Sequence, residues 1–131
     1  KLRHLKKWNG QRREIAKRYN RLFTGAEGAV TLPHEPESSR SVYHLYVLRV
    51  ADRVQLQKQL DEAGISTGIH YPVALHLTKA YEGLGFRAGD FPVAEKAVSQ
   101  VLSLPLFPDL TSRQQDRVVA AVLKSVAVTS G

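Results

Sequence analysis

Ser41-Val-Tyr-His-Leu-Tyr-Val-Leu-Arg-Val50 is the segment from which the fold of this chain is most readily inferred. It is rich in β-branched and aromatic residues, which favour a β-strand. Successive side chains of a strand point to opposite faces of the sheet. One face here would carry His44, Tyr46 and Leu48, and the other Tyr43, Leu45 and Val47. Because both faces are largely apolar, we expect this strand to be the central one of its sheet.

Helical patterns lie on both sides of this strand. Residues 2–23 repeat apolar side chains at intervals of three, four and seven, which predicts an amphipathic helix. After the strand, Asp52 and Gln55 resemble a capping box, and Gly64 is placed to end the helix that follows. Residues 30–32 favour a short strand within an otherwise polar connection.

The middle of the chain predicts shorter elements. Residues 65–71 suit a short strand, and residues 72–89 suit a loop with a helical turn around residues 75–81. Asp90 is expected to cap the next helix, with Pro92 in its first turn. The side chains expected to be buried on that helix are Val93, Ala97, Val98 and Val101.

Two more elements complete the pattern. Residues 102–106 suit a short strand. Thr111 and Gln114 predict a second capping box, which opens a helix to about residue 126, and residues 127–131 are expected to fray. Helices that alternate with few, short strands indicate one α+β domain of two layers, in which helices cover one face of a small sheet. At 131 residues and 43% hydrophobic, the chain can bury a modest core.

The positive charge of the chain is concentrated in its first helix. The formal net charge is +7, and residues 1–22 hold nine basic residues against one acidic residue, Glu14. The rest of the chain is close to neutral. Clustered Lys and Arg are the electrostatic footprint of nucleic-acid binding, but one basic helix is more often a solvated face or a subunit contact. Nucleic acid is therefore not the expected partner.

The composition also bears on the compartment. The chain has no cysteine, which excludes disulfides and thiolate metal sites and suits a reducing compartment such as the cytoplasm. It holds no apolar run of the roughly 20 residues that a membrane span needs, and no signal-peptide pattern. It also has no methionine, and Lys1 falls directly into a helical pattern. We therefore expect this sequence to be a piece of a longer protein.

Residues 64–108 hold the side chains with chemical potential. His70, Tyr71 and His76 lie close together in a loop punctuated by prolines, the kind of segment in which ligand contacts concentrate. The spacing of the two histidines matches no zinc-protease or zinc-finger pattern, so no metal is expected. Neither a nucleophile elbow nor a phosphate-binding glycine loop is present, and nothing marks Lys79 as a Schiff-base lysine. The histidines fit either substrate-contacting donors or hydrogen-bonded structural residues.

Four stretches, in order along the chain, together resemble one family of enzymes. They are Gly68-Ile-His-Tyr-Pro72, Leu75-His-Leu77 with Ala80-Tyr81, Gly89-Asp-Phe-Pro-Val-Ala-Glu-Lys96, and Leu102-Ser-Leu-Pro-Leu-Phe-Pro-Asp-Leu-Thr111. This string is similar to the C-terminal region of the DegT/DnrJ/EryC1/StrS family. These are pyridoxal-phosphate-dependent aminotransferases that act on nucleotide-linked keto-sugars.

The resemblance implies a fold of the aspartate-aminotransferase type, fold type I, whose small C-terminal domain has a short, mainly antiparallel sheet covered by helices. Residues 1–25 would be a long helix linking to a preceding domain, and residues 26–131 would form the small domain. The implied cofactor is pyridoxal 5'-phosphate, bound by that preceding domain through its Schiff-base lysine. The implied reaction transfers an amino group from glutamate to a nucleotide-linked keto-sugar, for amino-sugar and polysaccharide biosynthesis. The full enzyme would be a homodimer, and this fragment would be inactive alone.

Carried over to this sequence, the resemblance assigns substrate binding to four residues and assigns no catalytic residue. The four are His70, Tyr71, His76 and Tyr81, at the rim of the sugar pocket. Their implied role is to hydrogen-bond or stack on the hexose and so position its carbonyl. Two positions depart from the family: Ala74 replaces a usual proline, and Thr78-Lys79 replaces a usual Gln-Pro. Lys79 would then add a charge directed at a substrate phosphate.

Two other functions stay open. One is a non-catalytic binding module that uses the basic N-terminal helix. The other is a degenerate family member that regulates rather than transaminates. The sequence does not specify the sugar, the nucleotide or the carbon that is aminated.

Overall fold

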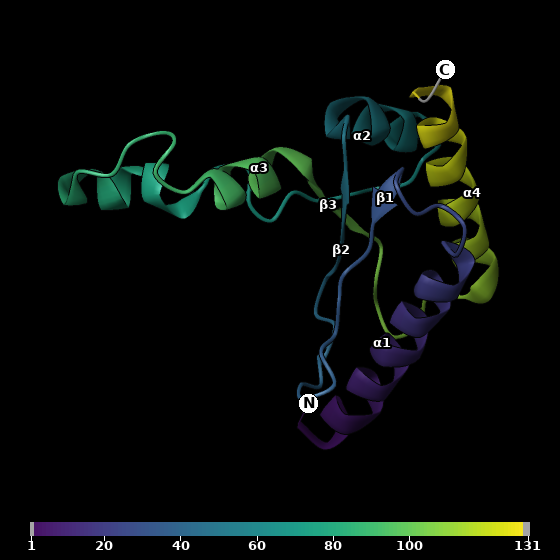
Figure 1. The fold of residues 1–131 in the computed structure, drawn as a ribbon. Helices are drawn as coiled ribbons and strands as arrows, with labels where there is room; N and C mark the ends of the chain where they lie inside the picture. Colours follow the sequence, from purple (N-terminus) through teal and green to yellow (C-terminus); the bar gives the residue numbers. More distant parts are fainter. Residues whose placement is uncertain (1, 130–131) are drawn as a thin grey trace.

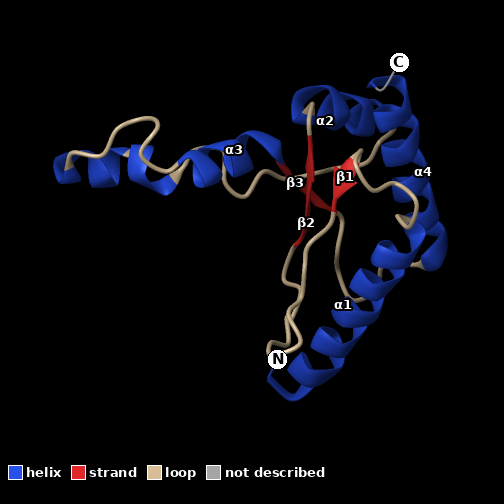
Figure 2. Ribbon diagram, viewed as in Figure 1, coloured by secondary structure: helices blue, strands red, loops and turns tan. Residues whose placement is uncertain are grey.

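The chain consists of helices and a small sheet (Figure 1; strands are red in Figure 2). The structure, a computed structural model, describes residues 2–129. The elements are α1 (Leu2–Leu22), β1 (Val30–Thr31), β2 (Tyr46–Val50), α2 (Arg53–Glu62), the 3-10 helices η1 (Leu75–Leu77) and η2 (Lys79–Leu84), α3 (Pro92–Gln100), β3 (Val101–Leu104) and α4 (Ser112–Thr129). None of the helices within residues 2–129 is both long and apolar enough to span a membrane.

The sheet has three strands in the order β1-β2-β3, and both pairings are antiparallel. In the register, Val50 pairs with Val30, and Tyr46 and Leu48 pair with Leu104 and Leu102. Because β2 has a partner on each side, the prediction of a central strand is confirmed.

One face of the sheet forms the core. Tyr46 and Leu48 of β2 and Leu102 of β3 are fully buried on this face. Tyr19 of α1 packs its ring against Tyr46, with 4.8 Å between the ring centroids. On the other face of β2, Val47 and Arg49 are only partly buried. The arrangement confirms the expected two-layer α+β domain, with helices over one face of a short antiparallel sheet.

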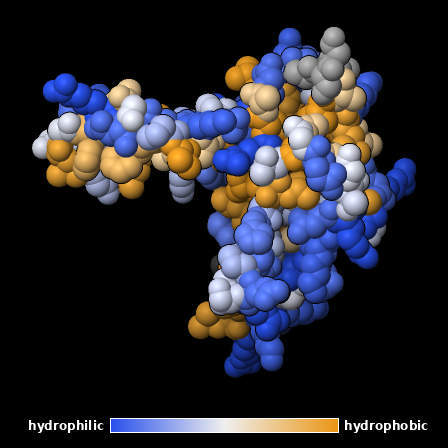
Figure 3. Space-filling model, in the orientation of Figure 1, coloured by the Kyte–Doolittle hydropathy of each residue, from blue (hydrophilic) through white to orange (hydrophobic). Residues whose placement is uncertain are grey.

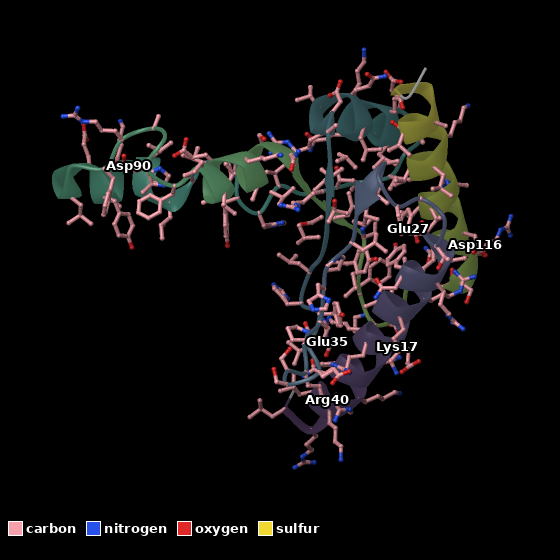
Figure 4. The ribbon with its side chains drawn as sticks, viewed as in Figure 1. Lys17, Glu27, Glu35, Arg40, Asp90 and Asp116 are labelled. Atoms are coloured by element: carbon pink, nitrogen blue, oxygen red, sulfur yellow. The ribbon has the colours of Figure 1, made fainter. Side chains whose placement is uncertain are left out.

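The first turn of α4 is tied to the second half of α1. Gln115 of α4 is buried and donates a hydrogen bond from Nε2 to the carbonyl oxygen of Ile15 in α1, at 2.9 Å. Nearer the surface, Arg18 forms an ion pair with Asp116 at 2.7 Å (Figure 4 labels Asp116). Part of the positive charge of α1 is therefore neutralised within the chain.

The predicted strand over residues 41–50 is too long at its start. β2 begins at Tyr46, because Tyr43 adopts a positive φ of 47° and residues 44–45 form a bend. The expected strand over residues 65–71 is also wrong. Only Gly68 bridges to Ser103, because the ring of His70 folds back and occupies the space beside Gly68.

The start of α3 differs from the prediction as well. Its N-cap residue is Phe91 rather than Asp90, whose carboxylate accepts from the backbone of Arg87 instead (Figure 4 labels Asp90). Val93, expected in the core, is 79% exposed. α4 continues to Thr129, beyond the expected end near residue 126, and the predicted fraying of residues 130–131 lies outside the described part.

Residues 71–100, which we call the arm, account for the exposure of Val93. The arm contains η1, η2 and α3, and Figure 1 shows it projecting away from α1 and α4. A helix in such a segment has no core to face, so Val93 stays exposed. Arg53, the first residue of α2, holds the base of the arm by donating a hydrogen bond to the carbonyl oxygen of Val98.

We predict that Gln115→Ala lowers the free energy of unfolding by about 1–3 kcal/mol, because the buried bond to α1 is lost. Chemical denaturation of the variant and the parent measures the difference. Gln57→Ala, on the partly exposed side of α2, is the matched control and should stay within about 0.5 kcal/mol of the parent. Equal effects of the two substitutions would contradict the bridging role of Gln115.

Candidate functional site

The four candidate residues lie at the base of the arm and along it. His70 lies immediately before the arm, where the chain leaves the sheet. Tyr71 follows and is 72% exposed, and Tyr81 in η2 is 38% exposed. His76 in η1 is buried, with 9% of its surface exposed. The two tyrosines are therefore open to a ligand, whereas His76 is largely covered.

A hydrogen bond to β3 holds His70 in place. Its Nδ1 lies 2.9 Å from Oγ of Ser103. The backbone of Ser103 pairs in both directions with Gly68, at 3.1 and 2.7 Å. A Cβ atom at position 68 would lie 2.6 Å from Cε1 of His70, so a glycine is needed for the ring to take this position. The imidazole thus lies over the backbone of Gly68.

His76 is part of a different cluster, inside the arm. Its Nε2 lies 3.0 Å from Oε1 of Glu95 in α3, and its ring packs on Phe91 with 4.7 Å between centroids. The same carboxylate accepts hydrogen bonds from the backbone N–H groups of Gly89 at 2.9 Å and Phe91 at 3.2 Å. One glutamate therefore joins η1, the loop before α3 and α3 itself.

These contacts change the acidity of Glu95. The hydrogen bond from the backbone of Gly89 is the largest influence that lowers the pKa of this carboxyl, and those from Phe91 and His76 act in the same direction. Desolvation opposes them but does not outweigh them. Hydrogen bonds to the ionised form favour that form. Glu95 is thus held as a carboxylate.

The arm also presents apolar side chains to solvent. Figure 3 shows hydrophobic residues gathered along one side of it. The exposed apolar residues there include Leu75, Leu84, Phe86, Phe91 and Val93. A contiguous apolar surface of this kind usually marks a site of interaction with another surface or a ligand.

Residues 2–129 contain no lysine with the surroundings expected of a Schiff-base lysine. Every lysine within residues 2–129 is exposed, including Lys79 in η2. A Schiff-base lysine is usually activated by burial in an apolar pocket or by a second cation. Within the same span, no group of three or more His, Cys, Asp or Glu side chains is placed to hold a metal. Within residues 2–129, the exposed tyrosines are therefore the side chains best placed to meet a ligand, and no lysine there is buried as a Schiff-base lysine usually is.

The sequence predicts one cluster of His70, Tyr71 and His76, whereas the structure separates His76 from the other two. The rings of His70 and Tyr71 lie 5.7 Å apart, whereas His76 belongs to the Glu95 cluster. Two residues that organise the site were not singled out, Ser103 and Glu95. Glu95 lies within Gly89–Lys96, four residues after Phe91, a position from which an acidic side chain can cap the start of a helix. The role of Ser103 has no comparable sequence signal.

Known proteins resemble the chain over nearly its whole length. The model of the DegT/DnrJ/EryC1/StrS aminotransferase family matches residues 1–123. The erythromycin biosynthesis sensory transduction protein EryC1 of Saccharopolyspora erythraea is 43% identical over 93% of this chain. The dTDP-3-amino-3,4,6-trideoxy-alpha-D-glucose transaminase of Streptomyces venezuelae is 41% identical over 93% of the chain. The chain spans about a third of the length of these relatives, 33% and 32%.

Solved structures agree with this relationship. The crystal structure of DesV from S. venezuelae, in complex with a ketimine intermediate, superposes with a TM-score of 0.86 and 39% identity, over 95% of this chain and 33% of that one. NtdA from Bacillus subtilis, with bound cofactor PMP, superposes with a TM-score of 0.79 and 32% identity, over 92% of this chain and 28% of that one. The chain belongs to the DegT/DnrJ/EryC1/StrS aminotransferase family.

Proposed function

We propose that the protein containing this chain is a pyridoxal-phosphate-dependent aminotransferase that transfers an amino group from glutamate to a nucleotide-linked keto-sugar. The observation that carries the proposal is the 41% identity to a transaminase of a dTDP-linked amino sugar. The proposed protein is a cytoplasmic homodimer. The PMP bound in NtdA supports a cofactor of the pyridoxal phosphate class.

Within that enzyme, residues 26–131 act as the small C-terminal domain. Residues 1–25, which include α1 (Leu2–Leu22), link this domain to a preceding part of the polypeptide that binds the cofactor. The exposed lysines of the chain support this division of labour, since none of those in the described part is buried as a Schiff-base anchor would be. When bound, the cofactor supplies the electron sink for amino transfer. The chain supplies a surface that positions the sugar.

His70, Tyr71, His76 and Tyr81 are the proposed substrate rim. Tyr71 and Tyr81 are exposed and can stack on a hexose or donate to its hydroxyls. His70 is held over Gly68 by Ser103, which presents one side of its ring to ligand. The contact between His76 and Glu95 holds η1 against α3, so His76 acts by fixing the backbone conformation of the arm.

The proposal predicts activity for the full-length protein and none for this chain alone. Full-length protein, incubated with pyridoxal phosphate, glutamate and dTDP-linked keto-sugars, should release 2-oxoglutarate and an amino sugar nucleotide, detected by mass spectrometry. The 131-residue chain should release neither, and borohydride should trap no lysine adduct on it. An adduct on Lys79 would overturn the placement of the anchor outside this chain. An inactive full-length protein that binds cofactor would overturn the enzymatic proposal.

Tyr71→Ala in the full-length protein should raise KM for the sugar nucleotide about tenfold, because one stacking or hydrogen-bonding contact is worth roughly 1.4 kcal/mol. The half-reaction with glutamate should keep its rate, since the variant leaves the cofactor domain unchanged. Phe107→Ala, at an exposed aromatic residue outside the arm (45% exposed, against 72% for Tyr71), is the control. An unchanged KM in Tyr71→Ala would remove Tyr71 from the rim.

The Glu95 cluster predicts a pH dependence of the arm. Folding lowers the pKa of Glu95 from its ordinary value of 4.5. The carboxylate therefore stabilises the arm fully at pH values above 4.5, and this stabilisation is lost as the pH falls through the lowered pKa. The amide resonances of Gly89 and Phe91 should therefore move towards unfolded values only below pH 4.5. Glu95→Gln should abolish this acid transition, whereas Glu82→Gln, in exposed η2, should preserve it. A transition that persists in Glu95→Gln would assign it to another group.

A regulatory role is the second candidate. It is favoured by the name of the 43% identical relative EryC1, a sensory transduction protein. The activity assay separates the two functions, because a purely regulatory family member would bind ligand without forming 2-oxoglutarate.

A further inference from the structure

A small recess opens at the base of the arm, next to His70. Its volume is about 180 Å³, and its polar lining comes from His44, Ser66, Thr67, His70 and Ser103. Gly68 and the side chains of leucine and proline residues form the remaining walls. Two imidazoles and three hydroxyls thus meet in a space whose described lining includes no carboxylate.

The backbone before β2 turns His44 towards this recess. In a continuous strand, His44 would share the buried face of Tyr46, because residues two apart point the same way. Instead Tyr43 has a φ of 47°, a left-handed conformation that is unfavourable for a bulky residue. Tyr43 is buried, with its hydroxyl donating to Glu35 at 3.0 Å, and His44 is exposed. The strained residue thus exposes an imidazole that a regular strand would bury, and strain of this kind concentrates at ligand sites.

The polar groups of the recess suit an oxyanion. Imidazole and hydroxyl groups can all donate hydrogen bonds, and a histidine offers a donor in either protonation state. When the hydroxyl of Ser103 donates to Nδ1 of His70, the Nε2–H of a neutral His70 is left as the donor for a ligand, and Nε2 has no protein partner within the described residues. The volume holds one phosphate or carboxylate group but is too small for a nucleoside. Without a neighbouring carboxylate, nothing in the lining repels the negative charge of such a group.

We propose that this recess binds an oxyanion of a substrate, a phosphate or a carboxylate, and that His44 is a binding residue for it alongside His70. The identity of the substrate rests on the proposed function. The phosphate would belong to the sugar nucleotide, and the carboxylate to the amino donor. The affinity of the recess for an oxyanion does not depend on whether the full-length protein transaminates.

Titration of the full-length protein, isotopically labelled at histidine, with inorganic phosphate and with glutarate tests the proposal, followed by NMR of the histidine side chains. The imidazole signals of His44 and His70 should shift together and saturate at the same concentration of at least one probe. A stronger response to phosphate would assign the recess to the sugar nucleotide, and a stronger response to glutarate to the amino donor. Shifts no larger than those of His34, an exposed loop residue, would overturn the proposal.

His44→Gln should weaken binding at His70 at least tenfold, whereas His34→Gln should not change it. Because His44 is exposed, its replacement should leave the spectrum of the core intact, which checks the fold of the variant. Unchanged affinity in a folded His44→Gln variant would exclude His44 from the site. These outcomes are read without an activity assay, so an inactive full-length protein would overturn the proposed function and leave this result in place.

Discussion

The contact between Tyr19 of α1 and Tyr46 of β2 fixes how the helical layer lies on the sheet. Both rings are fully buried, and a buried phenol requires a hydrogen-bond partner. Tyr46 donates to Oδ1 of Asn20 at 2.7 Å, and Tyr19 donates to the carbonyl oxygen of Pro105 at 2.9 Å. These two hydroxyls therefore connect α1, β2 and the segment after β3. Burial raises the pKa of both tyrosines, which keeps them neutral donors.

Those parts of the fold that depend on local chemistry could be predicted from the sequence. The capping residues Asp52 and Thr111 accept hydrogen bonds from the backbone of Gln55 and Gln114, as their spacing indicates. The apolar stripe of α4 and that of the second half of α1 face the core as their periodicity requires, whereas Leu5 near the start of α1 is 46% exposed. The wrong predictions fall where residues far apart in the sequence determine the backbone conformation. β2 starts late because Tyr43 turns towards Glu35, and a pattern of alternating side chains contains no information about that partner.

For the candidate site too, features of the local sequence could be predicted and long-range contacts could not. Sequence reasoning could select His70 and His76 as unusual side chains in a proline-rich loop, and it left open whether each binds substrate or is structural. The structure gives each a partner within the chain, Ser103 and Glu95. A partner found 33 positions away across a strand, as for His70, has no periodic signature. For the same reason the recess that His44 and His70 share could not be predicted, because its walls come from three separate segments.

Residues 74–95, the part of the arm beyond its base, hold their own side-chain hydrogen bonds, and this has an evolutionary consequence. The side-chain hydrogen bonds that residues 74–95 make in the described structure all join residues of that same segment. Substitutions on the exposed side of the arm therefore leave the packing of Tyr19, Tyr46 and their neighbours unaffected. A lineage can vary this segment at little cost in folding, while the sheet and its helices stay the same. Relatives with one architecture and different ligand preferences are the expected product of such a division.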